Sequence, residues 1–286
     1  MVFLQVAVNG LLLGAVYALF SSGLTLVWGM MNVVNFAHGD FVMLGMYAAF
    51  LAVLILHAGP LVFTTLTAVL MFLLGAVVYY GLIRKVMRGP MLAQILSTFG
   101  LALLIRYTIF WFFSATFLTL PRSVLSGTIN LEGLLLGIPQ LVAGIIAIVL
   151  TVGMHLLLTR TAIGSQILAV SEDRHAAMLM GIRPDRMQAL AWGLASASAG
   201  IAGALIATFY YLTPTVGEFL VLIGFVAVCF GGFGSIPGAM LAGLIIGLIE
   251  SGSAYYIGAV YKDVAVYALF VAILWVRPHG LMGTSS

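Results

Sequence analysis

Long, uninterrupted apolar segments are the feature that most limits what this chain can fold into. Runs rich in Leu, Ala, Val and Gly recur along all 286 residues, and each is close to the ~20 residues that an α-helix needs to cross a bilayer. A transmembrane β-barrel would instead alternate in polarity over segments of roughly ten residues. The sequence therefore predicts an all-α fold, a polytopic helical integral membrane protein.

The composition excludes a soluble fold. Only 7% of the residues are charged and 63% are hydrophobic, whereas a soluble domain carries about a quarter charged residues. The net charge of +3 follows from Lys and Arg in the loops of a membrane protein, so we expect no nucleic-acid partner. The lone cysteine, Cys229, lies in an apolar run and is interpreted as a packing residue.

We expect eight or nine crossings in a single transmembrane domain that covers residues 1–286. Two Gly-rich breaks, at residues 28–40 and 231–238, leave the number open, because each is either a turn at the membrane surface or a discontinuity within the membrane. The predicted spans are residues 3–28, 40–57, 61–83, 91–113, 139–158, 187–210, 217–231, 236–254 and 262–276.

Basic residues predict the orientation of these spans. With nine crossings, all three groups of basic residues fall on one side, and the positive-inside rule makes that side cytoplasmic. The N-terminus is then outside and the C-terminus cytoplasmic. We expect the outer segment 114–140 to form a short surface helix. The three basic groups are Arg84, Lys85 and Arg88; Arg160, Arg174, Arg183 and Arg186; and Arg277.

A polar island at residues 160–186 interrupts the apolar pattern. The chain has 11 Lys and Arg residues and eight Asp and Glu residues, and seven of these lie in the island. The island therefore leaves the bilayer, and its residues carry the signals of one short helix near residues 171–181. These signals are Ser171 as the N-cap, Glu172 and Asp173 in the first turn, Gly181 at the C-terminal stop, and Pro184 just beyond. We interpret the helix as a docking site for a partner.

Four polar residues, Asn32, Asn35, His38 and Asp40, crowd the first break. Polar groups in hydrocarbon must be buried with partners, hydrated or at the interface. The favoured interpretation is a broken helix whose freed backbone groups bond to these side chains. A proton relay through His38 and Asp40 stays open, and a metal site is not expected because ligands with suitable spacing are missing.

The second break and the adjoining segment also hold candidates for a transport pathway. Gly231, Gly232, Gly234 and Pro237 lie in GGFGSIPG, which has neither the preceding strand nor the G-K-[ST] of a nucleotide-binding loop. Small residues at 193–203 and 238–247 predict tight helix contacts, within this subunit or with another. Glu250 is the deepest of the intramembrane acids and is a candidate polar lining residue. No catalytic constellation is visible, and we expect no enzymatic activity.

Three motifs together resemble the permease subunits of branched-chain amino-acid ABC importers of the LivH type. The first is GLTLVWGMMNVVNFAHGDFVMLGMYAA at residues 23–49, and the third is GGFGSIPGAMLAGLIIGLIES at residues 231–251. The island supplies the second motif, although its Glu172 and Gly181 are nine positions apart and the general importer pattern E-A-A-x-x-x-G is not intact. The island residues that carry the resemblance are Ala169, Glu172, Asp173, Ala177, Gly181 and Ile182.

The resemblance implies a non-catalytic membrane subunit in a bacterial or archaeal cell (inner) membrane. It implies two cytoplasmic ABC ATPase subunits that bind ATP, a second related permease of the LivM type, and a periplasmic or lipid-anchored substrate-binding protein. No cofactor is expected on this chain. Ser171, Glu172, Asp173, Ala177 and Gly181 would form the coupling helix in an ATPase cleft.

Other functions stay open from the residues alone. An ion-coupled secondary transporter would use His38, Asp40 and Glu250, and broken helices at mid-membrane are typical of that class too. An intramembrane enzyme and a purely structural membrane subunit are weaker alternatives, because the first lacks a catalytic constellation and the second has no need of a capped cytoplasmic helix.

Overall fold

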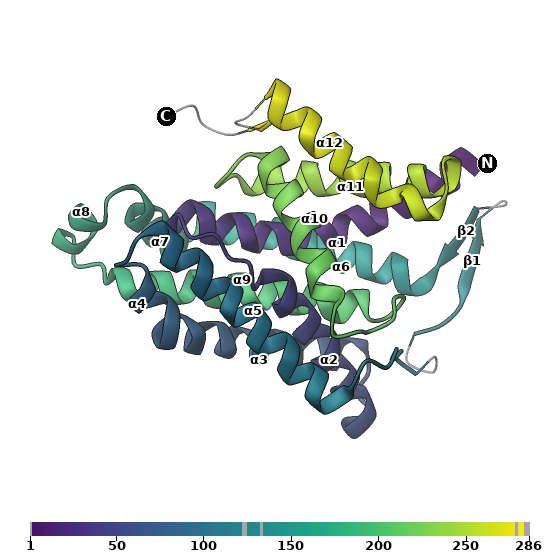
Figure 1. Cartoon of the computed structure of the whole chain (residues 1–286), viewed down its shortest axis with the longest axis horizontal. Coiled ribbons are helices and arrows are strands. Elements are labelled where there is room, and N and C mark those ends of the chain that lie inside the picture. The colour runs from purple at the N-terminus through teal and green to yellow at the C-terminus, as the bar shows by residue number, and fades with distance from the viewer. Residues whose placement is uncertain (1, 122–124, 132–133, 278–279, 283–286) are drawn as a thin grey trace.

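The chain folds into an elongated bundle of helices (Figure 1). The structure is a computed structural model, and it describes residues 2–121, 125–131, 134–277 and 280–282. The long helices are α1 (Val2–Met31), α2 (His38–Leu56), α3 (Pro60–Val78), α5 (Met91–Phe113), α6 (Ile138–Arg160), α9 (Pro184–Ile206), α10 (Val216–Gly231), α11 (Ile236–Tyr256) and α12 (Lys262–Val276). The shorter elements are a π-helical turn (Tyr79–Ile83), α4 (Arg84–Val86), α7 (Ala162–Glu172), α8 (Arg174–Leu179), a 3₁₀ turn (Ala259–Tyr261), β1 (Thr128–Leu131) and β2 (Leu134–Gly137).

The predicted all-α membrane fold is confirmed. Among the described residues, eight helical segments are long and apolar enough to cross a membrane, and α10 is a shorter apolar helix. The expected surface helix in segment 114–140 is wrong in its described part, where β1 and β2 form an antiparallel hairpin. Polar and apolar residues alternate at Thr128, Ile129 and Asn130, which is typical of a strand whose two faces have different surroundings.

The two ends of the bundle differ in charge. Figure 1 shows α4, α7 and α8 together at one end, and the β-hairpin and the N-terminus at the other. We call the first the basic end, because it carries the arginines of α4 and of the island. The C-terminal segment also reaches this end: the Leu281 amide donates to the Phe230 carbonyl at 2.8 Å, at the end of α10. The basic groups therefore gather at one end, as the sequence predicts.

Small residues allow the central helices to approach closely. A Cβ added to Gly14 of α1 would lie 2.7 Å from the Gly243 carbonyl oxygen of α11. On α9, a Cβ at Gly203 would lie 2.0 Å from the Val42 carbonyl oxygen of α2. The small-residue runs on α9 and α11 thus make tight contacts within this subunit, where only a missing side chain leaves room for the neighbouring backbone.

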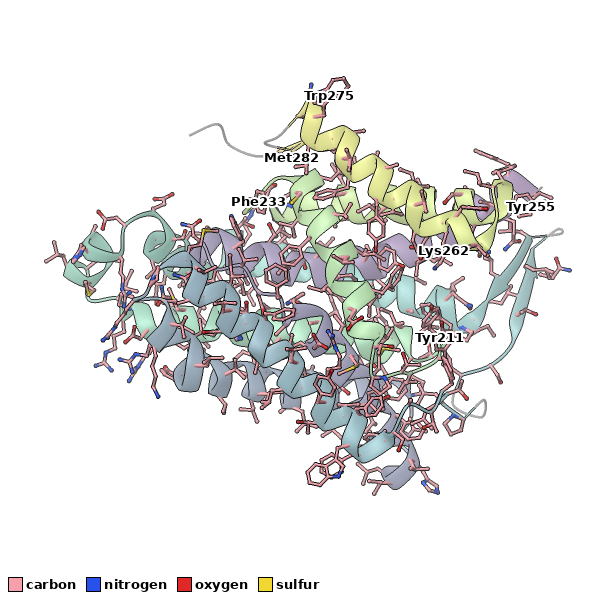
Figure 2. The ribbon with its side chains drawn as sticks, in the orientation of Figure 1. Tyr211, Phe233, Tyr255, Lys262, Trp275 and Met282 are labelled. Atoms are coloured by element: carbon pink, nitrogen blue, oxygen red, sulfur yellow. The ribbon has the colours of Figure 1, made fainter. Side chains whose placement is uncertain are left out.

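The outer helices turn apolar side chains away from the bundle. On α12 only Val266 is buried, and Trp275 points outward at its far end (Figure 2). Most side chains on α5 are also uncovered. In water such surfaces would mark an interaction site, and on a membrane protein they are the surface that lipid or another membrane subunit covers.

The break after α1 lies inside the bundle. Asn32 adopts a left-handed φ of 52°, and residues 33–35 continue without helix until α2 begins at His38. The Thr98 hydroxyl of α5 donates to the Val34 carbonyl at 2.9 Å, and Asp40 pairs with Arg106 further along α5. Residues 32–37 therefore run beside α5. Helix α2 begins next to the middle of α5 and not at the end of the bundle.

The break after α10 is a tight turn at the basic end. Gly232 and Gly234 have φ values of 99° and 81°, and Ser235 then caps α11 by accepting the Gly238 amide at 3.1 Å. The ring of Phe233 lies 4.6 Å from that of Trp28, near the end of α1. Of the two Gly-rich breaks, the first is therefore a discontinuity within the bundle and the second is a turn at its end.

Candidate functional site

The polar island folds as two short helices that project beyond the bundle at the basic end (Figure 1). Helix α7 begins after Thr161, whose hydroxyl oxygen accepts the Gly164 amide at 3.1 Å. The predicted N-cap at Ser171 is wrong: its hydroxyl donates to the Leu168 carbonyl at 2.7 Å, inside the last turn of α7. Glu172 is the last residue of that helix rather than part of a first turn. A second helix begins one residue later.

Asp173 is the N-cap of α8. Its Oδ1 accepts the amides of His175 at 2.7 Å and Ala176 at 3.0 Å, which are two of the free donors at a helix start. The hydrogen bond from the Ala176 amide, and to a lesser extent that from the His175 amide, lowers the pKa of the Asp173 carboxyl below its usual value. Asp173, in place of Ser171, therefore defines where the second helix of the island begins.

Gly181 ends α8 as predicted. It has a φ of 81°, its amide donates to the Met178 carbonyl at 3.0 Å, and the Ile182 amide donates to the Ala177 carbonyl at 3.0 Å. This pair of bonds is the Schellman arrangement, which favours glycine at the left-handed position. Ala177 faces inward and is buried, so α8 has one side fixed against the protein and one side free.

The free side of α8 is an apolar tip that sequence reasoning missed. Leu179 is 89% exposed, Met180 is 81% exposed, and Met178 beside them is also exposed. The signal was present as the run Met178-Leu179-Met180 inside an otherwise polar island. Large apolar side chains exposed in this way are typical of surfaces that contact another protein or a membrane.

An ion-pair network joins the island to the bundle. Asp185, in the first turn of α9, pairs through Oδ2 with Arg84 of α4 at 2.7 Å and through Oδ1 with Arg174 of α8 at 3.0 Å. Below it, the Tyr79 hydroxyl donates to Gln188 Oε1 at 2.8 Å. One carboxylate thus connects α8, α9 and the end of the third span.

The structure separates the four polar residues of the first break. Asn32 is exposed near the end of α1, whereas Asn35 is buried and its Oδ1 accepts the Ala37 amide at 3.1 Å. His38 donates from Nε2 to the Phe20 carbonyl in the middle of α1 at 2.8 Å. Asp40 lies deepest. The interpretation that side chains bond the freed backbone of a broken helix is confirmed for Asn35, whereas His38 bonds the backbone of α1 instead.

Asp40 belongs to a buried charge cluster. Its carboxylate, which is 0% exposed, accepts two hydrogen bonds from Arg106, from Nε at 3.2 Å and from Nη2 at 3.3 Å. The remaining Nη1 of Arg106 pairs with Glu218 in the first turn of α10. The cluster fastens the start of α2 to α5 and α10. Among the described residues, no three His, Cys, Asp or Glu side chains are grouped so that they could hold a metal ion.

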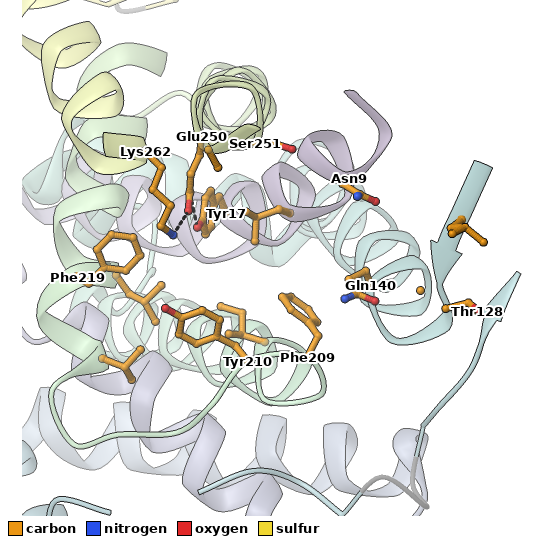
Figure 3. A pocket seen from close by; sticks show the side chains of 17 residues that line it. Asn9, Tyr17, Thr128, Gln140, Phe209, Tyr210, Phe219, Glu250, Ser251 and Lys262 are labelled. Atoms are coloured by element: carbon orange, nitrogen blue, oxygen red, sulfur yellow. Dashed lines mark hydrogen bonds and ion pairs between the residues drawn. The ribbon is translucent and has the colours of Figure 1, made fainter. Parts of the chain in front are cut away.

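Glu250 lies at the wall of a cavity of about 520 Å³ near the opposite end of the bundle (Figure 3). Its Oε2 accepts the Tyr17 hydroxyl at 2.7 Å, and its Oε1 accepts Lys262 Nζ at 2.6 Å. Gln140 and Tyr210 also line the cavity. Glu250 thus lines a cavity, and its place in a transport pathway stays a prediction. None of the described glycines of the second break lines this cavity.

Sequence reasoning missed the partners of Glu250. One signal was available: Glu250 and Lys262 lie on either side of the turn between two antiparallel spans, so their side chains meet across it. No sequence signal identifies Tyr17 or Gln140, because each comes from a helix far away in the chain. The packing of α1 and α6 around α11 decides that these residues share one cavity.

Comparisons with known proteins agree with one another over nearly the whole chain. The family model described as branched-chain amino acid transport system / permease component matches residues 6–274. The high-affinity branched-chain amino acid transport system permease protein BraD of Pseudomonas aeruginosa is 31% identical over 98% of this chain and 96% of its own. The LivH permease protein of Escherichia coli K12 shows the same identity and coverage.

A solved structure has a similar fold. PsaBC from Streptococcus pneumoniae, in complex with Fab, matches with a TM-score of 0.54 and covers 98% of this chain and 93% of its own. The sequence identity is 13%. This likeness therefore concerns the arrangement of the helices and not the molecule carried.

Proposed function

We propose that this chain, which belongs to the permease-component family of branched-chain amino-acid transport systems, forms part of the membrane pathway of an ATP-driven importer of branched-chain, apolar amino acids. The family resemblance predicted from three sequence motifs is confirmed. The chain is a multi-pass membrane permease. In our proposal it is non-catalytic and binds no cofactor, and separate ATPase subunits bind and hydrolyse ATP.

The observation that carries this proposal is the α7–α8 projection. A helix capped at both ends, with Leu179 and Met180 exposed at its tip, stands outside the spans at the basic end. A helix that lays apolar side chains into a groove is a common way for proteins to recognise one another. A cytoplasmic ATPase that offers such a groove is the partner that the family relationship suggests.

The remaining partners follow from the same relationship. We infer two ATPase subunits, a second permease of the LivM type, and a periplasmic or lipid-anchored binding protein that delivers the amino acid. The basic end then faces the cytoplasm and the N-terminus lies outside, in a bacterial or archaeal inner membrane. Lipid and the second permease cover the outward apolar side chains of α5 and α12.

The proposed mechanism is alternating access. Closure of the ATPase pair on ATP displaces α8, and the carboxylate of Asp185 passes this displacement to α4 and α9 through Arg84 and Arg174. A ligand or partner shifts such an equilibrium only through contacts that differ between the two states. Residues 32–40 and 231–238 are the places where the spans are interrupted and are proposed as pathway elements.

The ion-coupled secondary transporter is not favoured by the family relationship. His38, which such a transporter would use for protons, already donates to a backbone carbonyl inside the bundle. Uptake into vesicles reconstituted with the full complex separates the two mechanisms. We expect uptake to require ATP, and uptake driven by an ion gradient without ATPase subunits would contradict the proposal.

The first prediction concerns docking. Replacing Leu179→Asp at the tip of α8 should abolish co-purification of the ATPase subunits, because a carboxylate would have to be buried in an apolar cleft. The matched control is Val260→Asp, which makes the same change at an 84% exposed residue between α11 and α12. Pull-down from detergent-solubilised membranes measures both. Equal ATPase recovery from the two variants would refute docking through the tip.

The second prediction concerns coupling. Gly181→Ala forces a side chain into a left-handed conformation with no neighbour nearby, so it should disturb the end of α8 without a clash. Charge reversal of Glu172 and Asp173 should act similarly, with Asp173→Lys stronger because it also removes the N-cap. We expect ATP hydrolysis to continue while uptake falls about tenfold or more, with normal membrane insertion. Unchanged uptake in all these variants would exclude α8 as the coupling element.

A further inference from the structure

The cavity beside Glu250 has the properties of a ligand site. It measures about 520 Å³, within the range of about 300–1,000 Å³ that is usual for small-molecule sites. Helices α1, α6, α9, α10, α11 and the start of α12 surround it. Its walls are mainly apolar, and the polar groups stand at a few places (Figure 3). The site lies at the end of the bundle opposite α8.

Two opposite charges face this cavity from neighbouring helices. The Glu250 side chain is 4% exposed, and Lys262 at 25% exposure reaches it from the first residue of α12. Tyr17 fixes the second carboxylate oxygen, and Lys262 Nζ also lies 5.2 Å from the centre of the Phe219 ring. Among the described residues that line the cavity, the charged ones are Glu250 and Lys262, and they neutralise each other. Asp263, which is not part of the lining, lies 3.9 Å from Lys262 Nζ through Oδ1.

This arrangement discriminates between classes of ligand. An anion or a cation that entered the cavity would leave one member of the pair with an uncompensated charge in an apolar site, which is strongly unfavourable. A neutral sugar would leave the ion pair unused. A zwitterion satisfies both members at once, because its ammonium binds the acid, its carboxylate binds the lysine, and the total charge stays zero.

The remaining walls fit the rest of such a ligand. Leu13, Phe209, Val216 and Leu220 supply apolar surface next to the charged pair. Gln140 Oε1 is shielded from solvent and has no hydrogen-bond partner among the described residues, so it is a free acceptor for an N–H donor. A ligand with an ammonium, a carboxylate and an aliphatic side chain complements the charged pair and the apolar walls.

We propose that this cavity binds a zwitterionic aliphatic amino acid, with Glu250 receiving the α-ammonium group and Lys262 the α-carboxylate, which part from each other to admit it. This inference rests on the proposed transport function, to which it adds a site and two residue roles. The position opposite the docking helix places the site where a substrate would enter from outside.

Equilibrium binding of radiolabelled L-leucine tests the proposal. The protein is the full complex in lipid nanodiscs without the substrate-binding protein. We expect saturable binding of leucine. Competition by 4-methylpentanoate, which is leucine without the ammonium, and by isoamylamine, which is leucine without the carboxylate, should each be about tenfold or more weaker than competition by leucine. Ribose should not compete. Equal competition by either single-charge analogue, or no saturable leucine binding, would overturn the proposal.

Variants then locate the binding in this chain. Glu250→Gln and Lys262→Met should each weaken leucine binding by about tenfold or more. The double variant Glu250→Gln with Lys262→Met leaves no unpaired charge in the cavity, so it should assemble normally and still bind weakly. Lys85→Met at the basic end is the matched control and should bind like the parent protein. Parent-like leucine binding by the double variant would overturn the proposal.

The outcome separates this inference from the proposed function. If leucine binding depends on both charges but uptake does not need ATPase subunits, the site stands and the ABC mechanism falls. If uptake needs ATP but the double variant binds leucine normally, the mechanism stands and the site falls. The analogue series needs no substitution, so it decides the ligand class even where a variant fails to assemble.

Discussion

The two interruptions of the bundle, at residues 32–37 and 232–235, resemble each other in sequence and differ in structure. Both follow an apolar helix, and both have small or polar residues where a helix would stop. The first runs inside the bundle before α2 begins, and buried side chains hold it. The second turns at the basic end, where glycines and a serine cap hold it.

The difference follows from how each break satisfies its backbone groups. Away from water, an unpaired amide or carbonyl is costly, so the inner break needs polar partners such as Asn35 and Thr98. At the bundle end, left-handed glycines allow a compact turn, and Thr25 accepts the Gly234 amide at 3.0 Å. A break rich in buried polar side chains is therefore internal, and a break rich in glycine alone lies at the surface.

The largest expected effect is on the charge cluster of the inner break. Arg106→Leu would leave the fully buried Asp40 carboxylate without its cation, at a cost of about 3–5 kcal/mol of stability. Glu218→Gln is the control, because this partner of the same arginine is 57% exposed and exposed pairs contribute at most about 1 kcal/mol. SDS-titrated unfolding in micelles measures both. Similar losses of unfolding free energy in the two variants would mean that the burial of Asp40 does not determine how much stability Arg106→Leu removes.

A smaller effect should separate the glycines of the two breaks. A Cβ at Gly39 would lie 2.1 Å from the Gly217 carbonyl oxygen, whereas at Gly234 the nearest atom is 3.4 Å away. Gly39→Ala should therefore cost about 3 kcal/mol through overpacking against α10. Gly234→Ala should cost about 1 kcal/mol through its left-handed φ alone. Thermal unfolding in detergent ranks the two, and the reverse order would contradict the contrast between the breaks.

The smallest expected effect concerns one hydrogen bond. Thr98→Val keeps the side-chain shape but removes the donor to the Val34 carbonyl, so it should cost about 1 kcal/mol. Thr108→Val on the same helix is the control, because its hydroxyl donates to the Leu104 carbonyl of its own helix and is exposed. The difference between the two unfolding free energies is the contribution of the bond to the inner break. No difference would mean that the Val34 carbonyl is satisfied without Thr98.

Local signals located the spans well because the bilayer makes a simple demand. A helix such as Met91–Phe113 was expected at residues 91–113, since only a helix satisfies an apolar segment of that length. The end of α8 at Gly181 was also predictable from local chemistry. Its start was not, because Ser171 and Asp173 both have the chemistry of an N-cap and their local sequence does not rank them.

The pathway candidates show where local signals fail. Glu250 was recognisable as an acid in an apolar span, but Tyr17 lies 233 residues away and Lys262 on the next helix. Asp40 was recognisable as unusual, but its partner Arg106 lies 66 residues further along the chain. The pairing of acidic and basic side chains depends on how the helices pack, and residues along the whole chain determine that packing.

The sequence by itself determined the class of fold, the positions of the spans, the common side of the basic residues and the family, because each rests on composition or on residues close together in the chain. Only the tertiary structure decided that one break is internal and the other at the surface, that α7 and α8 are separate, and that Glu250, Lys262 and Tyr17 share a cavity. The physical reason is that hydrophobicity and caps act over a few residues, whereas pairing of buried charges depends on contacts between helices that are distant in sequence.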